Sequence, residues 1–338
     1  MNTSDLVATA RYLVAPGKGI LAADESTGTI KRRFDSIHLE STFENRRAYR
    51  DLLLSTPGVE AFISGVILYD ETIRQSDAQG LPFPQLLAGK GVVPGIKVDL
   101  GAKALALFPG EQITEGLDGL RERLNEYYGL GARFAKWRAV IGIGEGRPTR
   151  GCLSANAEAL ARYAALCQEA GLVPIVEPEV LMDGGHSLAR CAEVTEAALR
   201  IVFERLIDYR VALEGMLLKP NMVISGMNAA PRAGVNEVAE ATVRTLRRVV
   251  PAAVPGIVFL SGGQGPEEAT AHLNAMNALG AHPWELSFSY GRALQEPPLK
   301  AWGGQAANVP LAQQRYYQRA RLNGLARSGQ YTADMETA

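Results

Sequence analysis

The chain has 338 residues, with 35 Lys and Arg against 36 Asp and Glu, a formal net charge of −1 and 47% hydrophobic residues. This length suits two average domains or one large α/β barrel, and the composition excludes disorder over most of the chain. The balanced charge excludes the broad electrostatic attraction on which binders of nucleic acids and anionic membranes depend. We therefore expect no nucleic-acid or membrane partner, and any positively charged site must be local.

Signals for export and for metal binding are missing from the sequence. Asp5, Arg11, Lys18 and Asp24 interrupt the first thirty residues, and no later stretch is apolar enough to span a bilayer. The three cysteines form no CxxC pair and the four histidines form no metal-ligand spacing. We therefore expect a cytoplasmic protein without a disulfide framework and without a metal cofactor.

Short apolar runs alternate with helix-length segments along the whole chain. The runs predicted to be strands are residues 19–25, 63–70, 94–99, 134–141, 173–181, 216–223, 256–262 and 286–292. The segments predicted to be helices are residues 114–130, 154–171, 187–209, 235–250, 266–280 and 310–327, with a short helical segment at about 1–18. The polar end of the chain, from about 329 to 338, is predicted to be mobile.

Eight such strand and helix units without a long linker predict one (β/α)8 barrel, a TIM barrel, as a single domain over residues 1–338. A doubly wound open sheet is the alternative. That fold is expected to carry a GxGxxG turn after its first strand, and this turn is absent here. The GIGEG stretch at residues 142–146 does not have that pattern.

Charged side chains interrupt five of the apolar strands near their C-terminal ends. Three of these strands carry a pair spaced two residues apart, which places both side chains of the pair on one face of the strand. The residues are Asp24, Lys97, Asp99, Lys136, Arg138, Glu177, Glu179 and Lys219. Any one of them could be a solvated strand end or a structural ion pair, but together they predict a charged cluster, because charges survive in a barrel only when they are paired or useful.

A neutral lysine would balance this cluster, which counts five positive and four negative groups once Arg292 is included. Crowding by other cations in a partly dry cavity disfavours the ammonium form of a lysine, and the free amine attacks carbonyls. The pattern therefore predicts Schiff-base chemistry on Lys136 or Lys219, and position alone leaves both open. Adjacent carboxylates would carry the protons.

A phosphate site is predicted after the seventh and eighth strands. The LSGGQG stretch at 260–265 follows a strand and opens a helix, so that its backbone N–H groups can face an anion, and SYGR at 289–292 adds a guanidinium. The residues of this predicted site are Ser261, Gly262, Gly263, Gly291 and Arg292.

A basic run after the first strand, which includes Arg32 and Arg33, is typical of a solvated helix face. Beside Lys97 and Arg138 it could instead hold a second phosphate.

Eight stretches in order closely resemble class I fructose-bisphosphate aldolases, and the resemblance spans nearly the whole chain. They are AADESTGTI (22–30), GIKVDLG (95–101), FAKWR (134–138), VPIVEPEVL (173–181), LLKPNMV (217–223), FLSGGQ (259–264), SYGRAL (289–294) and KAWGG (300–304). The resemblance implies a (β/α)8 barrel that reversibly cleaves fructose 1,6-bisphosphate to dihydroxyacetone phosphate and glyceraldehyde 3-phosphate, without metal. It also implies a role in glycolysis and gluconeogenesis and a homotetramer.

The same resemblance assigns roles to the charged cluster. Lys219 matches the Schiff-base lysine, Glu177 the acid/base group and Glu179 its supporting carboxylate. Asp24 and Lys136 match groups that hold the substrate hydroxyls and tune the charge around the imine. Ser261, Gly262 and Arg292 match the 1-phosphate site, and Lys97 and Arg138 match residues toward the 6-phosphate end.

The sequence departs from the family pattern near that 6-phosphate end. Thr29, Arg32 and Leu100 stand where the family usually has Ser, Lys and Lys. Many members also carry a longer tail ending in a Tyr that helps to protonate the enamine, whereas Tyr331 matches a residue before that tail and is not given this role.

Two other functions remain open at this point. One is a Schiff-base aldolase for another ketose bisphosphate, such as sedoheptulose 1,7-bisphosphate, because only the far phosphate grip would differ. The other is a catalytically silent binding protein that has kept the barrel, which would have to retain the charged cluster without using it.

Overall fold

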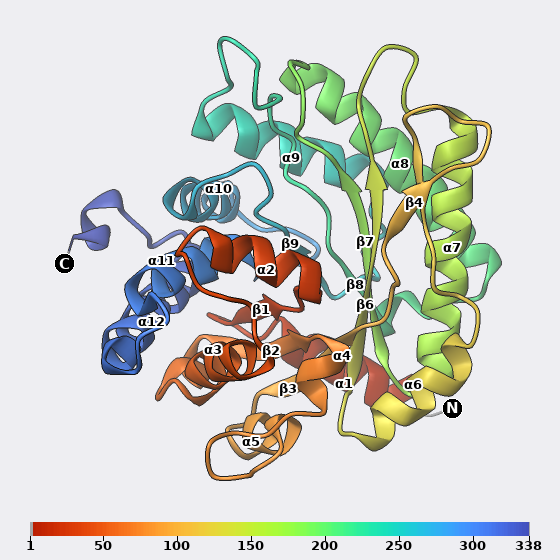
Figure 1. The fold of residues 1–338 in the computed structure, drawn as a ribbon. Helices are drawn as coiled ribbons and strands as arrows, with labels where there is room; N and C mark the ends of the chain where they lie inside the picture. Colours follow the sequence, from red (N-terminus) through yellow and green to blue (C-terminus); the bar gives the residue numbers. More distant parts are fainter. Residues whose placement is uncertain (1–2, 338) are drawn as a thin grey trace.

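Eight parallel strands close into a barrel in the computed structural model, which describes residues 3–337 (Figure 1). They are β1 (Gly19–Ala23), β2 (Ile63–Leu68), β3 (Val93–Lys97), β6 (Phe134–Ile141), β7 (Val173–Val180), β8 (Leu217–Leu218), β9 (Gly256–Phe259) and β10 (Glu285–Tyr290). Their order around the barrel is β1-β10-β9-β8-β7-β6-β3-β2. The predicted (β/α)8 barrel is confirmed and the open sheet is wrong.

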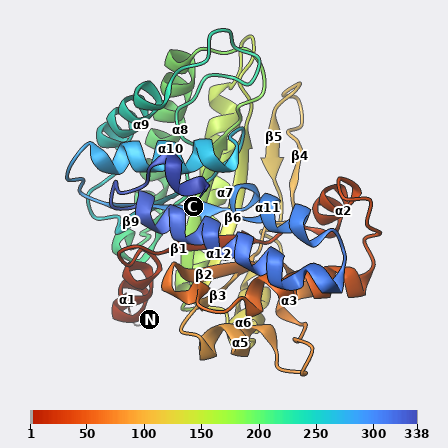
Figure 2. The ribbon, with the colours of Figure 1, turned by 90° about the vertical axis from the view of Figure 1, so that its left-hand side faces the viewer.

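Helices surround this barrel, as Figures 1 and 2 show from two sides. They are α1 (Thr3–Leu13), α2 (Thr27–Asp35), α3 (Phe43–Ser55), α4 (Asp70–Ile73), α5 (Phe83–Gly89), α6 (Leu120–Gly129), α7 (Arg150–Glu169), α8 (Leu188–Asp208), α9 (Val235–Val249), α10 (Pro266–Ala278), α11 (Arg292–Trp302) and α12 (Val309–Ala326). Short 3-10 turns lie at Val59–Ala61, Leu213–Gly215, Ala306–Asn308 and Ala333–Glu336. A small antiparallel hairpin of β4 (Ala102–Ala104) and β5 (Gln112–Thr114) stands beside the barrel (Figure 2).

The N-terminal end of the barrel is closed by α1. Its Leu6 and Leu13 form one apolar cluster with barrel residues that include Ile20 and Phe134. The Phe134 ring fills the space beside Gly95, where a Cβ atom would lie 2.3 Å from the ring Cζ. This packing leaves the C-terminal mouth of the barrel as the end at which a site can form.

Apart from β6, which ends at Ile141 as predicted, the strands end earlier than predicted, and several charged residues therefore lie just beyond them. The largest difference is at residues 216–223, where β8 contains only Leu217–Leu218. Pro220 follows two residues later, and proline has no N–H for a strand ladder. Lys219 therefore lies immediately after β8.

The predicted helix at 114–130 is in part wrong. Thr114 closes β5, and α6 begins only after Gly119, whose φ of +65° is a left-handed conformation that favours glycine. Five helices, α2, α3, α4, α5 and α11, lie in segments for which no helix bounds were predicted.

At the end of the chain, Tyr331 is buried and its hydroxyl lies 2.9 Å from Glu336 Oε1. The mobility expected for residues 329–338 stays a prediction, and residues 1, 2 and 338 lie outside the described part of the chain.

Candidate active site

A cavity of about 630 Å3 opens at the C-terminal mouth of the barrel. Except for Gly263, every site residue predicted from the sequence lines it: Asp24, Thr29, Arg32, Arg33, Lys97, Lys136, Arg138, Glu177, Glu179, Lys219, Ser261, Gly262, Gly291 and Arg292. They come from β3, β6 and β7, from the segments just after β1, β8, β9 and β10, from α2 and from the start of α11. Barrel closure thus brings together charges that are far apart in the sequence.

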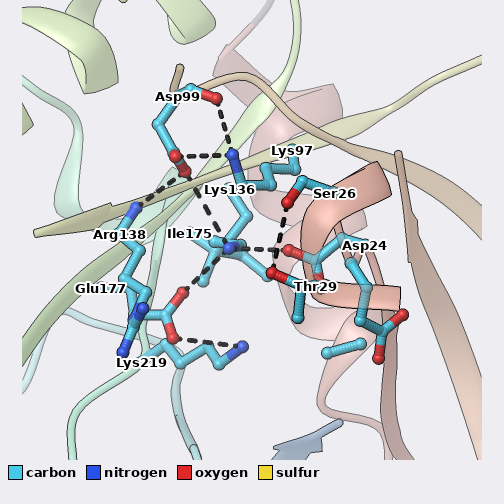
Figure 3. A network of polar contacts seen from close by, with 12 residues as sticks. Asp24, Ser26, Thr29, Lys97, Asp99, Lys136, Arg138, Ile175, Glu177 and Lys219 are labelled. Carbon is cyan, nitrogen blue, oxygen red and sulfur yellow. Dashed lines mark hydrogen bonds and ion pairs between the residues drawn. The ribbon is translucent and has the colours of Figure 1, made fainter. Parts of the chain in front are cut away.

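Lys136 is surrounded by carboxylates (Figure 3). Its Nζ lies 2.7 Å from Asp24 Oδ2, 3.4 Å from Glu177 Oε2 and 4.0 Å from Asp99 Oδ2, and its side chain is 4% exposed. Burial by itself lowers the pKa of Lys136, but the negative charges of Asp24, Glu177 and Asp99 raise this pKa well above its usual value. Lys136 is therefore an ammonium group at neutral pH.

The same contacts act on Asp24. Burial raises the pKa of this carboxyl, but the positive charges of Lys136, Lys219 and Lys97 outweigh burial and hold the pKa well below its usual range. Asp24 is therefore an anion throughout the neutral range.

Glu177 lies between the two lysines, with one oxygen toward each. Lys219 Nζ is 3.4 Å from Oε1, and Lys136 Nζ is 3.4 Å from Oε2 (Figure 3). Within residues 3–337, Oε2 is buried and forms no hydrogen bond, so its contact with Lys136 is an attraction between charges without hydrogen-bond geometry. The Glu177 carboxyl group is therefore placed to accept a proton as a carboxylate, or to donate one when protonated, next to the amine of Lys219.

Lys97 and Arg138, two of the residues predicted for the far phosphate, are both paired with carboxylates. Arg138 Nε donates to Glu179 Oε2. Lys97 Nζ donates to the Asp99 side chain at 2.6 Å and to its carbonyl at 2.7 Å. Burial lowers the pKa of Arg138, but Glu179 and the other nearby carboxylates raise it overall. Both side chains line the cavity, and Arg138 keeps its charge there.

The turn between β9 and α10 packs closely against one side chain. A Cβ atom at Gly262 would lie 2.5 Å from Met182 Cε, and one at Gly263 would lie 2.3 Å from Met182 Cγ. Gly263 also has φ +72°, so this position requires glycine, whereas a side chain at Gly262 would have to displace the flexible end of Met182. Ser261 Oγ accepts a hydrogen bond at 3.4 Å from the N–H of Ala293, in the first turn of α11.

The basic residues of α2 have local partners. Arg32 donates to Thr29 Oγ1 at 3.2 Å, and the Thr29 hydroxyl is 3.2 Å from that of Ser26. Arg33 NH1 lies 2.5 Å from Glu25 Oε1. Burial raises the pKa of the Glu25 carboxyl, but the positive charges of Arg33 and Arg50 outweigh burial and lower this pKa overall. Helix α2 therefore presents two guanidinium groups and a hydroxyl to the cavity.

Comparison with known proteins identifies the family. The sequence model described as fructose-bisphosphate aldolase class-I matches residues 5–338. The chain belongs to the class I fructose-bisphosphate aldolase family, a family of lyases. It is 60% identical to a probable fructose-bisphosphate aldolase class 1 of Xanthomonas campestris over 98% of this chain and 99% of that one. It is 54% identical to the cytosolic fructose-bisphosphate aldolase 4 of Arabidopsis thaliana over 99% of this chain and 86% of that one.

A solved structure agrees with the fold. The fructose-bisphosphate aldolase of Plasmodium falciparum, solved in complex with TRAP and a small-molecule inhibitor, superposes with a TM-score of 0.97 at 53% identity, over 98% of this chain and 96% of that one. The resemblance stated from the motifs is confirmed. These relatives are named for fructose bisphosphate, so the seven-carbon alternative finds no support among them.

The three departures from the family pattern lie at the outer edge of the site. Thr29 and Arg32 are hydrogen-bonded to each other, so the two changes fall within one contact. Leu100 is 63% exposed and lines a second cavity, of about 570 Å3, which shares Lys97 and Arg138 with the first.

Several cavity residues were not singled out from the sequence as site residues. They are Ala22, Glu25, Ser26, Leu181, Met182, Asp183, Met227, Leu260 and Ser289. Ser26 and Ser289 stand inside the motifs AADESTGTI and SYGRAL and could have been found there. Among the described residues, no cluster of three or more His, Cys, Asp and Glu could hold a metal ion, and no helix is long and apolar enough to cross a membrane.

Proposed function

We propose that this chain catalyses the reversible cleavage of fructose 1,6-bisphosphate to dihydroxyacetone phosphate and glyceraldehyde 3-phosphate through an imine on Lys219. The observation that carries this proposal is the position of Glu177, whose two oxygens lie 3.4 Å from the Nζ atoms of Lys136 and Lys219. One of these lysines is held as an ammonium, and the other lies at the open cavity beside a carboxylate.

Imine formation uses Lys219 and Glu177. Glu177 first takes a proton from Lys219, and the free amine then attacks the C2 carbonyl of the open-chain substrate. A proton moves from the nitrogen to the C2 oxygen, which gives the carbinolamine. Glu177, as the acid, gives a proton to the C2 hydroxyl, which leaves as water while the nitrogen lone pair forms the protonated imine. Glu177 is then a carboxylate again.

Carbon–carbon cleavage reverses the direction of proton flow. Glu177 takes the proton of the C4 hydroxyl, the C3–C4 bond breaks, and its electrons move to the imine nitrogen to give an enamine. Glyceraldehyde 3-phosphate leaves. A proton from the solvent adds to the enamine at C3 and restores the protonated imine. Water then adds to C2 and the C–N bond breaks, which releases dihydroxyacetone phosphate and returns Lys219 with its proton, while Glu177 gives the proton of the C4 hydroxyl back to the solvent.

The remaining charges hold the substrate in place. Asp24 and Lys136 keep opposite charges beside the reacting carbons and bind the hydroxyl groups, and Glu179 supports Glu177 and orients Arg138. The 1-phosphate is bound by Ser261, Gly262, Gly263, Gly291 and Arg292. The 6-phosphate is bound by Thr29, Arg32, Arg33, Lys97 and Arg138.

The protonated imine acts as the electron sink, so the proposal includes no metal and no other cofactor. We further propose that the chain acts in the cytoplasm, in glycolysis and gluconeogenesis, and that it forms a homotetramer, which light scattering would measure. Two observations support the first part: the Arabidopsis relative is named cytosolic, and the family is described as glycolytic.

Borohydride trapping tests the mechanism directly. Reduction in the presence of dihydroxyacetone phosphate should leave a stable adduct on Lys219, located by peptide mapping. Lys219→Met should fold and lose both adduct and cleavage, while Glu177→Gln should lower kcat about 100- to 10,000-fold because it removes the proton carrier. A label on Lys136 in place of Lys219, or a change in KM alone for Glu177→Gln, would refute these assignments.

A further inference from the structure

The strand that carries Lys219 is much shorter than its neighbour. β8 contains two residues, which pair with Ile175 and Val176 of β7. The Lys219 N–H donates the next ladder bond, to the Val176 carbonyl at 2.8 Å, and Pro220 then has no N–H to offer. β7 continues for four residues beyond this point, and those residues include Glu177 and Glu179.

The end of β7 therefore has a backbone donor without a partner strand. The Val176 carbonyl faces β8, and Leu181 donates to β6, so the alternation along the strand turns the Val180 N–H toward the β8 side. Pro178, on that same side, has no N–H. Val180 is buried, and leaving its N–H unpaired would be costly.

The side chain of Asn221 accepts the hydrogen bond from this N–H group. Its Oδ1 accepts the Val180 N–H at 3.0 Å, and its Nδ2 donates to Thr195 Oγ1 of α8 at 3.1 Å and to the Met222 carbonyl at 3.0 Å. Asn221 is 3% exposed. Because the oxygen faces an N–H and the nitrogen faces a carbonyl, these partners fix one orientation of the amide.

We propose that Asn221 is a positioning residue that replaces the missing end of β8. It ties the segment two residues beyond Lys219 to the residue directly after Glu179, and so maintains the 3.4 Å spacing between Lys219 Nζ and Glu177 Oε1 (Figure 3). This inference rests on the proposed function, since it concerns the same amine and carboxylate.

The test compares variants of the full-length enzyme. Asn221→Ala removes the bridge, and Thr195→Val removes one acceptor of its amide with little change in shape, while Thr195→Ser keeps the hydroxyl. Asn323→Ala is the matched control. Asn323 is also buried and accepts a hydrogen bond from a threonine, Thr270, at 3.0 Å, but it lies on α12 and not in the segment after β8. The measurements are kcat, KM, the rate of borohydride trapping on Lys219 and the thermal midpoint.

Asn221→Ala should lower kcat and the trapping rate about 10- to 100-fold, because displacement of reacting groups by about 1 Å has that effect. Its KM should stay within about threefold, because the phosphate sites are unchanged. Thr195→Val should lower kcat about 2- to 10-fold, Thr195→Ser should restore it, and Asn323→Ala should lower the midpoint while keeping kcat.

A kcat of folded Asn221→Ala within about threefold of the wild-type value, or an equal kcat loss in Asn323→Ala, would overturn the inference. Should Asn221→Ala not fold, equal kcat and trapping rates for Thr195→Val and Thr195→Ser would overturn it instead. A wild-type enzyme that forms no adduct on Lys219 would refute the proposed function, which separates the two failures.

Discussion

Lys136→Met tests whether the charges of the cavity depend on each other. The substitution removes an ammonium that lies within 4.0 Å of three carboxylates and is 4% exposed, and it leaves an apolar chain of similar length. Removing one partner of a buried ion pair costs about 3–5 kcal/mol, because the charges left behind stay buried without compensation. We expect a loss of this size in the free energy of unfolding at pH 7.

The matched control is Lys31→Met on α2. Lys31 Nζ lies 2.9 Å from Asp35 Oδ1, a distance similar to that between Lys136 and Asp24, but its side chain is 61% exposed. An exposed ion pair of this kind contributes about 0–1 kcal/mol, because water screens it. The two variants thus remove lysines that lie at similar distances from a carboxylate, one buried and the other exposed.

The loss caused by Lys136→Met should depend on pH. In the wild-type fold the pKa of Asp24 lies below its unfolded value, so the stability that Asp24 contributes is present above the unfolded pKa of about 3.9 and is lost as pH falls below it. Without Lys136 the pKa of Asp24 in the folded state rises, so the variant takes up a proton more easily in acid. The difference in stability between wild type and variant should therefore shrink as pH falls from 7 toward about 4.

Equilibrium unfolding in urea measures both effects, with the midpoint and slope determined at each pH. A cost for Lys136→Met no larger than that for Lys31→Met would show that the cavity charges are solvated and independent. A difference in stability that stays constant with pH would show that Lys136 does not control the ionisation of Asp24. Either result would refute the reasoning.

Three further results are expected. Burial lowers the pKa of His272 to about 4, so the stability contributed by its neutral form is present above the unfolded pKa of about 6.5 and is lost on acidification. Between pH 7 and about 5 the free energy of unfolding of the wild type, measured in urea, should fall by about 2 kcal/mol, and that of His272→Asn should lack this decrease. Parallel curves for the two proteins would contradict this. Glu25→Gln should destabilise the fold by about 3–5 kcal/mol in the same assay, because it removes the carboxylate paired with Arg50, whose side chain is 3% exposed. A loss below about 1 kcal/mol would show that Arg50 needs no anion. Cleavage of fructose 1,6-bisphosphate should continue in EDTA, and strong inhibition would point to a metal-dependent reaction.

The strands of the barrel could be predicted because their apolar runs and charged ends are local features. Lys136 with Arg138, and Glu177 with Glu179, are spaced two apart, and both pairs line the cavity as the strand period requires. The contact between Lys136 and Asp24 could not be predicted in the same way. It joins β6 to the residue after β1, and its 2.7 Å distance depends on how the closed barrel brings strand ends together.

Other features escaped prediction because their causes are tertiary. The strand predicted at residues 216–223 extends to Val223, but the ladder of β8 stops at Pro220, and the side chain of Asn221 replaces it. The hairpin β4–β5 lies almost wholly before the helix predicted at residues 114–130, and only Thr114, the last residue of β5, belongs to both. Asn221 follows a proline, a common turn pattern, and only the position of Val180 shows what it does.

The structure also bears on the choice between the two lysines, which the sequence left open. Lys136 contacts three carboxylates, which raise its pKa and keep it protonated, whereas the ion pair of Lys219 is with Glu177. A nucleophilic amine must first lose its proton, so the three carboxylates around Lys136 disfavour that role. The positions of the two lysines on either side of one carboxylate thus support the tasks proposed for them: a fixed positive charge for Lys136, and for Lys219 the amine that Glu177 serves as acid and base.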